Sequence, residues 1–363
     1  MSGDIPLTNP TVTPRDIESV SDMLHRGRLV DGHCRAMLEQ AVADAIGIDS
    51  AIAVASASEA FPLILQSMGV RPGDDVILPA LGDPQWLAAV QSVGAIPRFA
   101  DCNATTQLPS TERLDDMIQP DTRLVVIGTS DVGVEGMQAL AGICGKHEVP
   151  MVELVGSRFG SRCGTKPTGS IGRVSIIDFS PASPVSAGGG AVIVTNDGTI
   201  AAACREAGAC GTMAMMAEPC AALGLSFLHR IEEILDACTL IAQQYTLHLS
   251  GIPELMLPAT SQSDQTTWSR LVVRLDETFS KQDRDEIIRG MQRHDIATSS
   301  GMADICTLHG CRNGHCCPMA SSLATRSVSL PMHTGLTKRE VELVCQTLRL
   351  MIQRATFRRT ENN

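Results

Sequence analysis

The side chains best suited to chemistry gather in one short stretch of the chain, CTLHGCRNGHCCPMA. This stretch contains the thiols and imidazoles of Cys306, His309, Cys311, His315, Cys316 and Cys317. Soft ligands at this density could hold zinc or an iron–sulfur cluster. The spacing contains no Cys-x-x-Cys pair, however, so we predict reactive or merely buried loop thiols here and no metal site.

A second stretch, DFSPASPVSAGGGAVIVTND at residues 178–197, is typical of a strand that enters a glycine-rich turn and leaves as another strand. Such bends at the edge of a sheet are common places for a cofactor. This one carries no lysine, histidine or cysteine that could react with a cofactor. We therefore expect Gly188, Gly189 and Gly190 to supply a tight turn with positive φ rather than to contact a ligand.

The composition indicates a globular protein. Apolar residues make up 44% and charged residues 19% of the 363 residues, which excludes a disordered class. The net charge of −11 disfavours nucleic acid or an anionic membrane surface as a partner. The sequence shows no secretory signal and no apolar stretch long enough to span a bilayer. We therefore expect a cytoplasmic protein whose thirteen cysteines are mostly reduced.

Strands and helices alternate along the first two thirds of the chain. Strands are expected over residues 51–56, 74–80, 96–101, 123–129 and 150–154, and helices over 21–48, 58–70, 84–94 and 136–147. The first of these helices places Leu38, Ala41, Val42 and Ile46 on one face. This order predicts an α/β protein with a mostly parallel sheet between helices, and a ligand at the carboxyl ends of its strands.

The pattern changes after a long amphipathic helix over residues 227–249. A strand, a helix over 281–292 and a final helix from 338 to about 353 follow. We predict a large domain over residues 1–245 and a smaller C-terminal α+β domain over residues 246–363.

Several segments, taken in order, resemble a known family from one end of the chain to the other. IPLTNP, VRPGDDVILPA, VGAIPRFADCN, GGGAVIVTND and VSLPMHTGLTKREVELV are similar to segments of the DegT/DnrJ/StrS-type sugar aminotransferases. The resemblance implies the fold-type I architecture of pyridoxal-phosphate enzymes. It also implies a homodimer with active sites at the subunit interface, and nucleotide-linked keto sugars as substrates.

The resemblance also shows which catalytic positions differ. Ser183 stands where the family has the lysine that forms a Schiff base with the cofactor, a bond that a hydroxyl cannot form. Leu154 replaces the carboxylate that pairs with the pyridinium nitrogen, and Ser157 the polar group near the ring oxygen. Asp83 takes the place of the stacking aromatic ring, and Trp86 follows three residues later. Each of the four lysines, Lys146, Lys166, Lys281 and Lys338, lies in a segment that reads as surface helix or loop.

The phosphate-binding positions differ as well. Ala57, Ser58 and Glu59 stand at the turn whose backbone would hold the phosphate, so a carboxylate enters the first helical turn. Asp178 replaces the phosphate-binding serine, and Met213 corresponds to an asparagine contributed by the neighbouring subunit. Carboxylates beside a phosphate dianion are unfavourable. We therefore expect no cofactor, with pyridoxal phosphate bound only if the alignment is wrong.

Three hypotheses follow for the function. The first is a catalytically degenerate member of the family, a structural or regulatory pseudoenzyme that forms a homodimer or a heterodimer with an active paralogue and has a nucleotide sugar as its ligand. The second is an enzyme of altered chemistry, in which Glu59, Asp83 and Asp178, beside Trp86 and Ser183, hold a cation or an amine. The third is an ordinary sugar aminotransferase whose lysine is misassigned.

Overall fold

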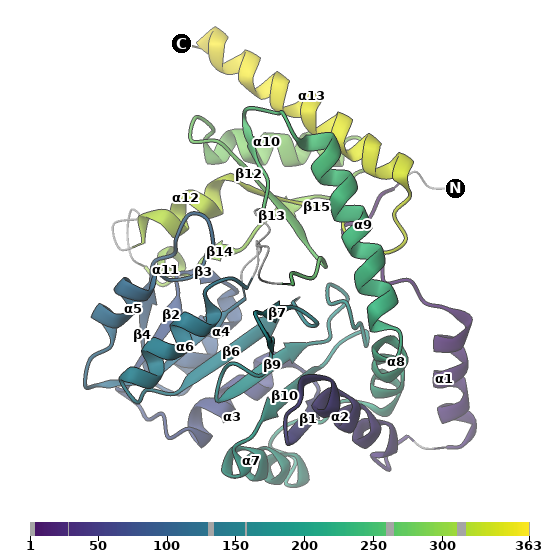
Figure 1. Cartoon of the computed structure of the whole chain (residues 1–363), viewed down its shortest axis with the longest axis vertical. Coiled ribbons are helices and arrows are strands. Elements are labelled where there is room, and N and C mark those ends of the chain that lie inside the picture. Colours follow the sequence, from purple (N-terminus) through teal and green to yellow (C-terminus); the bar gives the residue numbers. More distant parts are fainter. Residues whose placement is uncertain are drawn as a thin grey trace.

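A seven-stranded sheet forms the centre of this computed structural model, which describes residues 4–27, 29–129, 134–156, 158–258, 265–310 and 317–362 (Figure 1). The strands lie in the order β1 (Ser50–Val54), β10 (Ala191–Thr195), β9 (Val174–Asp178), β6 (Met151–Gly156), β5 (Thr122–Gly128), β2 (Asp75–Pro79) and β4 (Ile96–Ala100). Five neighbours, from β9 to β4, run parallel, and β10 is antiparallel to both β9 and β1. The predicted mostly parallel α/β sheet is confirmed.

Alternating side chains of the central strands point to two separate apolar cores. In β5, Leu124 and Val126 belong to one buried cluster, and Val125 and Ile127 belong to another. Helices α3 (Ala57–Ser67), α4 (Pro84–Ser92) and α7 (Gly198–Ala209) supply the first cluster, and α5 (Thr111–Met117) and α6 (Met137–Lys146) supply the second. A strand buried on both faces in this way reads as a continuous apolar run, as β5 does.

The C-terminal part of the chain builds a second, four-stranded sheet. Its order is β11 (Leu255–Met256), β12 (Leu271–Leu275), β15 (Ser327–Leu330) and β13 (Ser299–Ser300). Helices α10 (Lys281–Gln292), α12 (Pro318–Arg326) and α13 (Lys338–Asn362) accompany it, whereas α11 (Ile305–Leu308) packs against α4. Figure 1 shows α13 lying across α9 (Ile231–Leu249), and the two helices pack together.

Two short antiparallel pairs complete the strands. β3 (Leu81–Gly82) pairs with β14 (Ala303–Asp304), which joins the segment after β2 to the C-terminal part of the chain. β7 (Arg162–Cys163) pairs with β8 (Lys166–Pro167). The β3–β14 pair brings residues beyond position 300 to the edge of the central sheet.

The helix expected over residues 21–48 is instead two helices. α1 (Pro14–His25) ends before Gly27, and α2 (His33–Ile46) begins after Gly32. Both glycines have positive φ, 63° and 75°, a conformation that ends a helix and that other residues rarely adopt. Leu38, Val42 and Ile46 are buried as expected, whereas Ala41 is only partly buried.

The last helices also differ from the expected boundaries. The long helix begins at Ile231, after α8 (Glu218–Leu228), and α13 continues to Asn362 instead of ending near residue 353. The predicted domain boundary at 245 falls inside α9, and one apolar cluster contains residues from both sheets, including Val192 and Leu271. The two-domain division stays a prediction. Within the described residues, no helix combines the length and the apolar character needed to cross a bilayer.

Candidate functional site

A cavity of about 400 Å³ opens where the parallel strands of the central sheet end. Pro79 of β2, Gly128 of β5, Leu154 of β6 and Asp178 of β9 line it, together with residues of the segment 301–303 that β14 brings there. We call this cavity the cleft. Its place agrees with the general rule that ligands bind beyond the carboxyl ends of parallel strands.

Two carboxylates face the cleft. Asp83 is the N-cap of α4, and its Oδ1 and Oδ2 accept hydrogen bonds from the backbone N and the Nε2 of Gln85, each at 3.0 Å. Asp178 ends β9, and its carboxylate accepts from the backbone N of Ser180 at 3.1 Å and from its Oγ at 2.6 Å. Burial raises the pKa of Asp178, the bonds from Ser180 oppose this, and the charge of Asp83 raises the pKa further. The two acids are therefore close enough to interact.

The remaining walls include an apolar side chain and an aromatic one at predicted positions. Leu154 is 4% exposed, and its uncharged side chain stands at the position where the resemblance places the carboxylate partner of the pyridinium nitrogen. Trp86 lines the cleft and packs edge-on against Phe61, with 5.2 Å between the ring centroids. This contact fixes the indole at the cavity wall.

Five polar residues of the cleft were missed by the sequence analysis: Gln85, Gln107, Thr129, Ser180 and Arg270. Thr129 ends the strand predicted over residues 123–129 and directly follows β5 in the structure, so its position at a strand end was a usable signal. Gln107 lies in a loop, and its left-handed backbone, with φ of 58°, cannot be read from the sequence. Arg270 precedes a strand of the second sheet, and only the tertiary structure shows that this strand begins beside the cleft.

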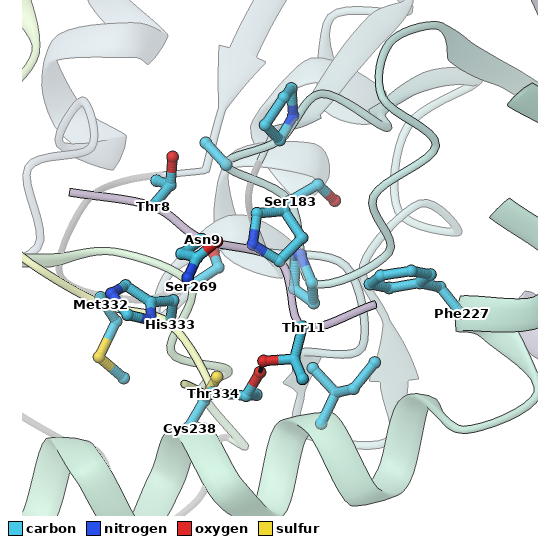
Figure 2. A pocket seen from close by; sticks show the side chains of 15 residues that line it. Thr8, Asn9, Thr11, Ser183, Phe227, Cys238, Ser269, Met332, His333 and Thr334 are labelled. Carbon is cyan, nitrogen blue, oxygen red and sulfur yellow. Dashed lines mark hydrogen bonds between the residues drawn. The ribbon is translucent and has the colours of Figure 1, made fainter. Parts of the chain in front are cut away.

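Ser183 does not line the cleft, contrary to the predicted pocket. Its backbone N donates to Ser180 O at 2.9 Å, and this turn directs the side chain into a second, smaller cavity of about 40 Å³. Figure 2 shows Ser183 there, with Thr8 and Asn9 of the N-terminal segment and with His333. Ser183 is 7% exposed, and its Oγ has no hydrogen-bond partner within the described part of the chain. Ala182, in the middle of this turn, lines both the cleft and the smaller cavity.

Of the residues that the resemblance places at the phosphate-binding turn, some line the cleft and others lie outside it. Ala57 lines the cleft, and the Ser58 hydroxyl donates to Gln85 Oε1 at 2.6 Å. Glu59 is exposed and lies outside the cleft lining, and its backbone N donates to the N-cap Ser56. The prediction that Glu59 shares a pocket with the two aspartates is therefore wrong.

Met213 also lies away from the cleft. It is 4% exposed and packs in the cluster formed with Ile52 and Val54 of β1. Its side chain is thus part of the core of its own chain, because the turn after α7 folds back on β1. Ser157 lies outside the described residues.

All four lysines are described, and none lines the cleft. Each of Lys146, Lys166, Lys281 and Lys338 is exposed. The Lys146 ammonium pairs with Asp115 at 2.7 Å on the surface. No primary amine of a side chain therefore reaches the cavity.

The cysteine- and histidine-rich stretch is only partly described, since Cys311, His315 and Cys316 fall outside the described residues. Cys306 and Cys317 are 2% and 1% exposed. His309 is hydrogen-bonded to Gln91 at 3.1 Å and packs near Phe99. Among the residues that the structure places, no group of three or more His, Cys, Asp or Glu side chains is arranged to hold a metal ion.

Comparison with known proteins identifies the family. The sequence matches the DegT/DnrJ/EryC1/StrS aminotransferase family over residues 10–349. The chain belongs to this family. It is similar to GDP-perosamine synthase of Vibrio cholerae, with 23% identity over 95% of this chain and 98% of that protein.

Two solved structures of this fold superpose closely on the chain. Spr1654 of Streptococcus pneumoniae in its PLP form has a TM-score of 0.90 and 21% identity, covering 97% of this chain and 99% of that one. DesI, solved with its TDP-sugar product, has a TM-score of 0.88 and 22% identity, covering 99% and 96%. The expected aminotransferase fold is confirmed.

The prediction that the chain has no cofactor is wrong. It belongs to an aminotransferase family, and its structural relative Spr1654 has been solved in PLP and PMP forms, which points to pyridoxal phosphate as the cofactor. The residues of this cleft nevertheless do not fit a covalently attached cofactor, because none of the described lining residues carries an amine. That prediction rested on the missing Schiff-base lysine and on carboxylates at the phosphate-binding positions. Covalent attachment is only one of several contacts that hold such a group, and Glu59, one of those carboxylates, lies outside the cleft.

Proposed function

We propose that this chain is a catalytically degenerate member of the nucleotide-sugar aminotransferase family. In this proposal it acts in the cytoplasm as a structural or regulatory pseudoenzyme of sugar or polysaccharide metabolism. The observation that carries the proposal is the position of the lysines, all four of which are exposed and outside the cleft.

Transamination needs an amine at the reacting centre. A lysine there would hold the cofactor covalently and would move protons at the reacting carbons, and the hydroxyl of a serine could not form the covalent bond. Ser183 is poorly placed even for proton transfer, because its Oγ is buried beside the smaller cavity rather than the cleft. Leu154 also disfavours transamination, since an apolar side chain cannot stabilise a protonated ring nitrogen.

The retained scaffold supports a role in binding. The cleft persists at the edge of the sheet with a volume of about 400 Å³, in the range of small-molecule sites. A structural relative, DesI, has been solved with its TDP-sugar product, which supports a nucleotide sugar as the ligand here. We further propose that the chain forms a homodimer, or a heterodimer with an active paralogue whose turnover it modulates.

A turnover assay tests the proposal. The purified chain is supplied with pyridoxal phosphate, glutamate and a nucleotide-linked keto sugar, and the amino sugar is quantified by mass spectrometry. We expect no product above the protein-free background, while an active family member in the same buffer forms product. Turnover by this chain would overturn the proposal.

The partner role needs a separate measurement. The chain is mixed with an active paralogue from the same source, and the complex is sized by light scattering after chromatography. We expect a heterodimer and a changed turnover rate of the paralogue. If the two proteins elute separately and the rate is unchanged, the regulatory part of the proposal fails.

A further inference from the structure

A third cavity, of about 70 Å³, lies between the loop that follows β4 and the strands β11 and β12 of the second sheet. We call it the β12 cavity. Thr105 and Gln107 of the loop and Arg274 of β12 are the polar residues of its described lining, which contains no carboxylate. Arg274 is therefore the one charged group among the described residues of its wall.

The charge of Arg274 has no carboxylate partner. Its guanidinium donates from Nη1 to Ala104 O and from Nη2 to Met256 Sδ at 3.0 Å, and a thioether is a weak acceptor. Within the described part of the chain, its Nε is buried without a hydrogen-bond partner, and the side chain forms no ion pair. Charged groups inside a protein are normally paired. This guanidinium therefore keeps a donor for an anion.

A second arginine near Arg274 increases the excess of positive charge. Arg326 is 8% exposed, and its guanidinium donates to carbonyl and hydroxyl oxygens, all of them neutral. Burial lowers the pKa of Arg274, and the charge of Arg326 lowers it further, while Cys102 and Glu277 act in the opposite direction. An anion beside Arg274 would relieve the repulsion between the two cations.

Gln107 can supply a second donor. It lines both the cleft and the β12 cavity, is 6% exposed, and its Oε1 has no hydrogen-bond partner among the described residues. A side-chain amide can turn by 180°, which exchanges the positions of its oxygen and its NH₂ group. The turned amide has its NH₂ group where the unpaired oxygen lies now, so it can donate to an anion held by Arg274.

The volume of the β12 cavity limits the size of the anion. One water molecule needs about 10–15 Å³ of such space, so 70 Å³ holds about five to seven non-hydrogen atoms. Phosphate and sulfate have five, whereas a nucleotide sugar or pyridoxal phosphate is far larger. The guanidinium group also suits oxyanions of this kind, because its N–H groups can donate to two oxygens at once.

We propose that the β12 cavity binds a free tetrahedral oxyanion of the phosphate type, which accepts hydrogen bonds from Arg274 and from the turned amide of Gln107. This site is separate from the cleft, since Gln107 is the one described residue that lines both. The inference goes beyond the proposed function and does not depend on it. Because Gln107 belongs to both linings, a bound ion would hold this part of the cleft wall in place.

Calorimetric titration with inorganic phosphate at constant ionic strength tests the inference. The protein is titrated alone and with saturating pyridoxal phosphate, which occupies any phosphate site of the cleft. We expect one ion per chain in both cases. Arg274→Gln should weaken binding by at least about tenfold, as is typical for the loss of a hydrogen bond to a charged group.

Arg270→Gln is the matched control. It removes the single cation of the cleft's described lining and lies outside the β12 cavity, so it should leave the affinity for phosphate unchanged. Gln107→Glu keeps the length of the side chain and places a carboxylate beside Arg274, so we expect it to abolish binding. Thermal unfolding of each variant confirms that it is folded.

Several results would overturn the inference. These are no saturable binding of phosphate, the same affinity in Arg274→Gln as in the wild type, or binding that pyridoxal phosphate or Arg270→Gln abolishes. Uridine diphosphate is titrated as well. If it bound and inorganic phosphate did not, the arginine would serve a nucleotide and not a free ion. Turnover in the transamination assay bears on the proposed function alone.

Discussion

Replacing Glu153 by glutamine should destabilise the protein, although the two side chains have nearly the same shape. Glu153 is fully buried in β6, directly before Leu154 of the cleft wall. Its Oε1 accepts from Gly169 N at 2.8 Å. Its Oε2 accepts from Ile171 N at 3.0 Å, Gly172 N at 3.1 Å and Ser175 Oγ at 3.1 Å. Burial raises the pKa of Glu153, and these four donors act in the opposite direction.

The magnitude follows from the donors. A glutamine can turn its oxygen towards the three donors at Oε2, but its NH₂ group then faces the N–H of Gly169. One buried N–H loses its acceptor, and the other three bonds lose the assistance of the charge. We expect a loss of about 2–4 kcal/mol in the free energy of unfolding.

Urea unfolding followed by far-UV circular dichroism measures this loss. Ser175→Ala is the control, since it removes one donor and leaves three, and should cost about 1 kcal/mol. If the cost of burying the charge dominated instead, Glu153→Gln would be as stable as the wild type or more so, and the reasoning would be refuted.

Three further predictions concern charge, packing and thiols. Because the pKa of Asp178 is raised above 3.8 in the folded protein, its contribution to stability is present at low pH and lost as pH rises through the raised pKa. Urea titrations should therefore show Asp178→Asn gaining stability relative to wild type over this range, and a flat or falling difference would contradict the assignment. Gly190→Ala should cost at least about 1 kcal/mol more than Gly188→Ala, because a Cβ at Gly190 would lie 3.1 Å from the backbone oxygen of Val54 and 2.6 Å from Met216 Cε, while Gly188 faces open space; equal losses would argue against this packing. Burial raises the pKa of five thiols to about 11 or 12, those of Cys102, Cys144, Cys204, Cys238 and Cys345. In the native protein, iodoacetamide should therefore label the exposed Cys210 and leave these five unmodified, which peptide mass spectrometry measures.

The sequence predicted those parts of the fold that depend on local pattern. The helix over residues 281–292 has the predicted bounds, and the central strands follow the apolar runs. Gly188, Gly189 and Gly190 all have positive φ, as expected of the turn. The break between α1 and α2 was missed, because two glycines with left-handed backbones interrupt an otherwise helical pattern.

The candidate site was predictable only in part. Asp83, Trp86 and Asp178 meet at one cavity because Asp178 ends β9, Asp83 directly follows β3, and Trp86 lies in the first turn of the helix that comes next. Ser183 and Glu59 lie close to them in sequence, but a turn and a helix direct their side chains elsewhere. Gln107 comes from a loop whose approach to the cleft depends on the whole fold.

The central claim, that no side-chain amine serves this cleft, is tested most directly by reducing the protein with borohydride in the presence of equimolar pyridoxal phosphate. The intact mass and the peptide map then show any covalently fixed cofactor. We predict no stoichiometric attachment at any position. One cofactor group per chain on a single lysine would contradict the account.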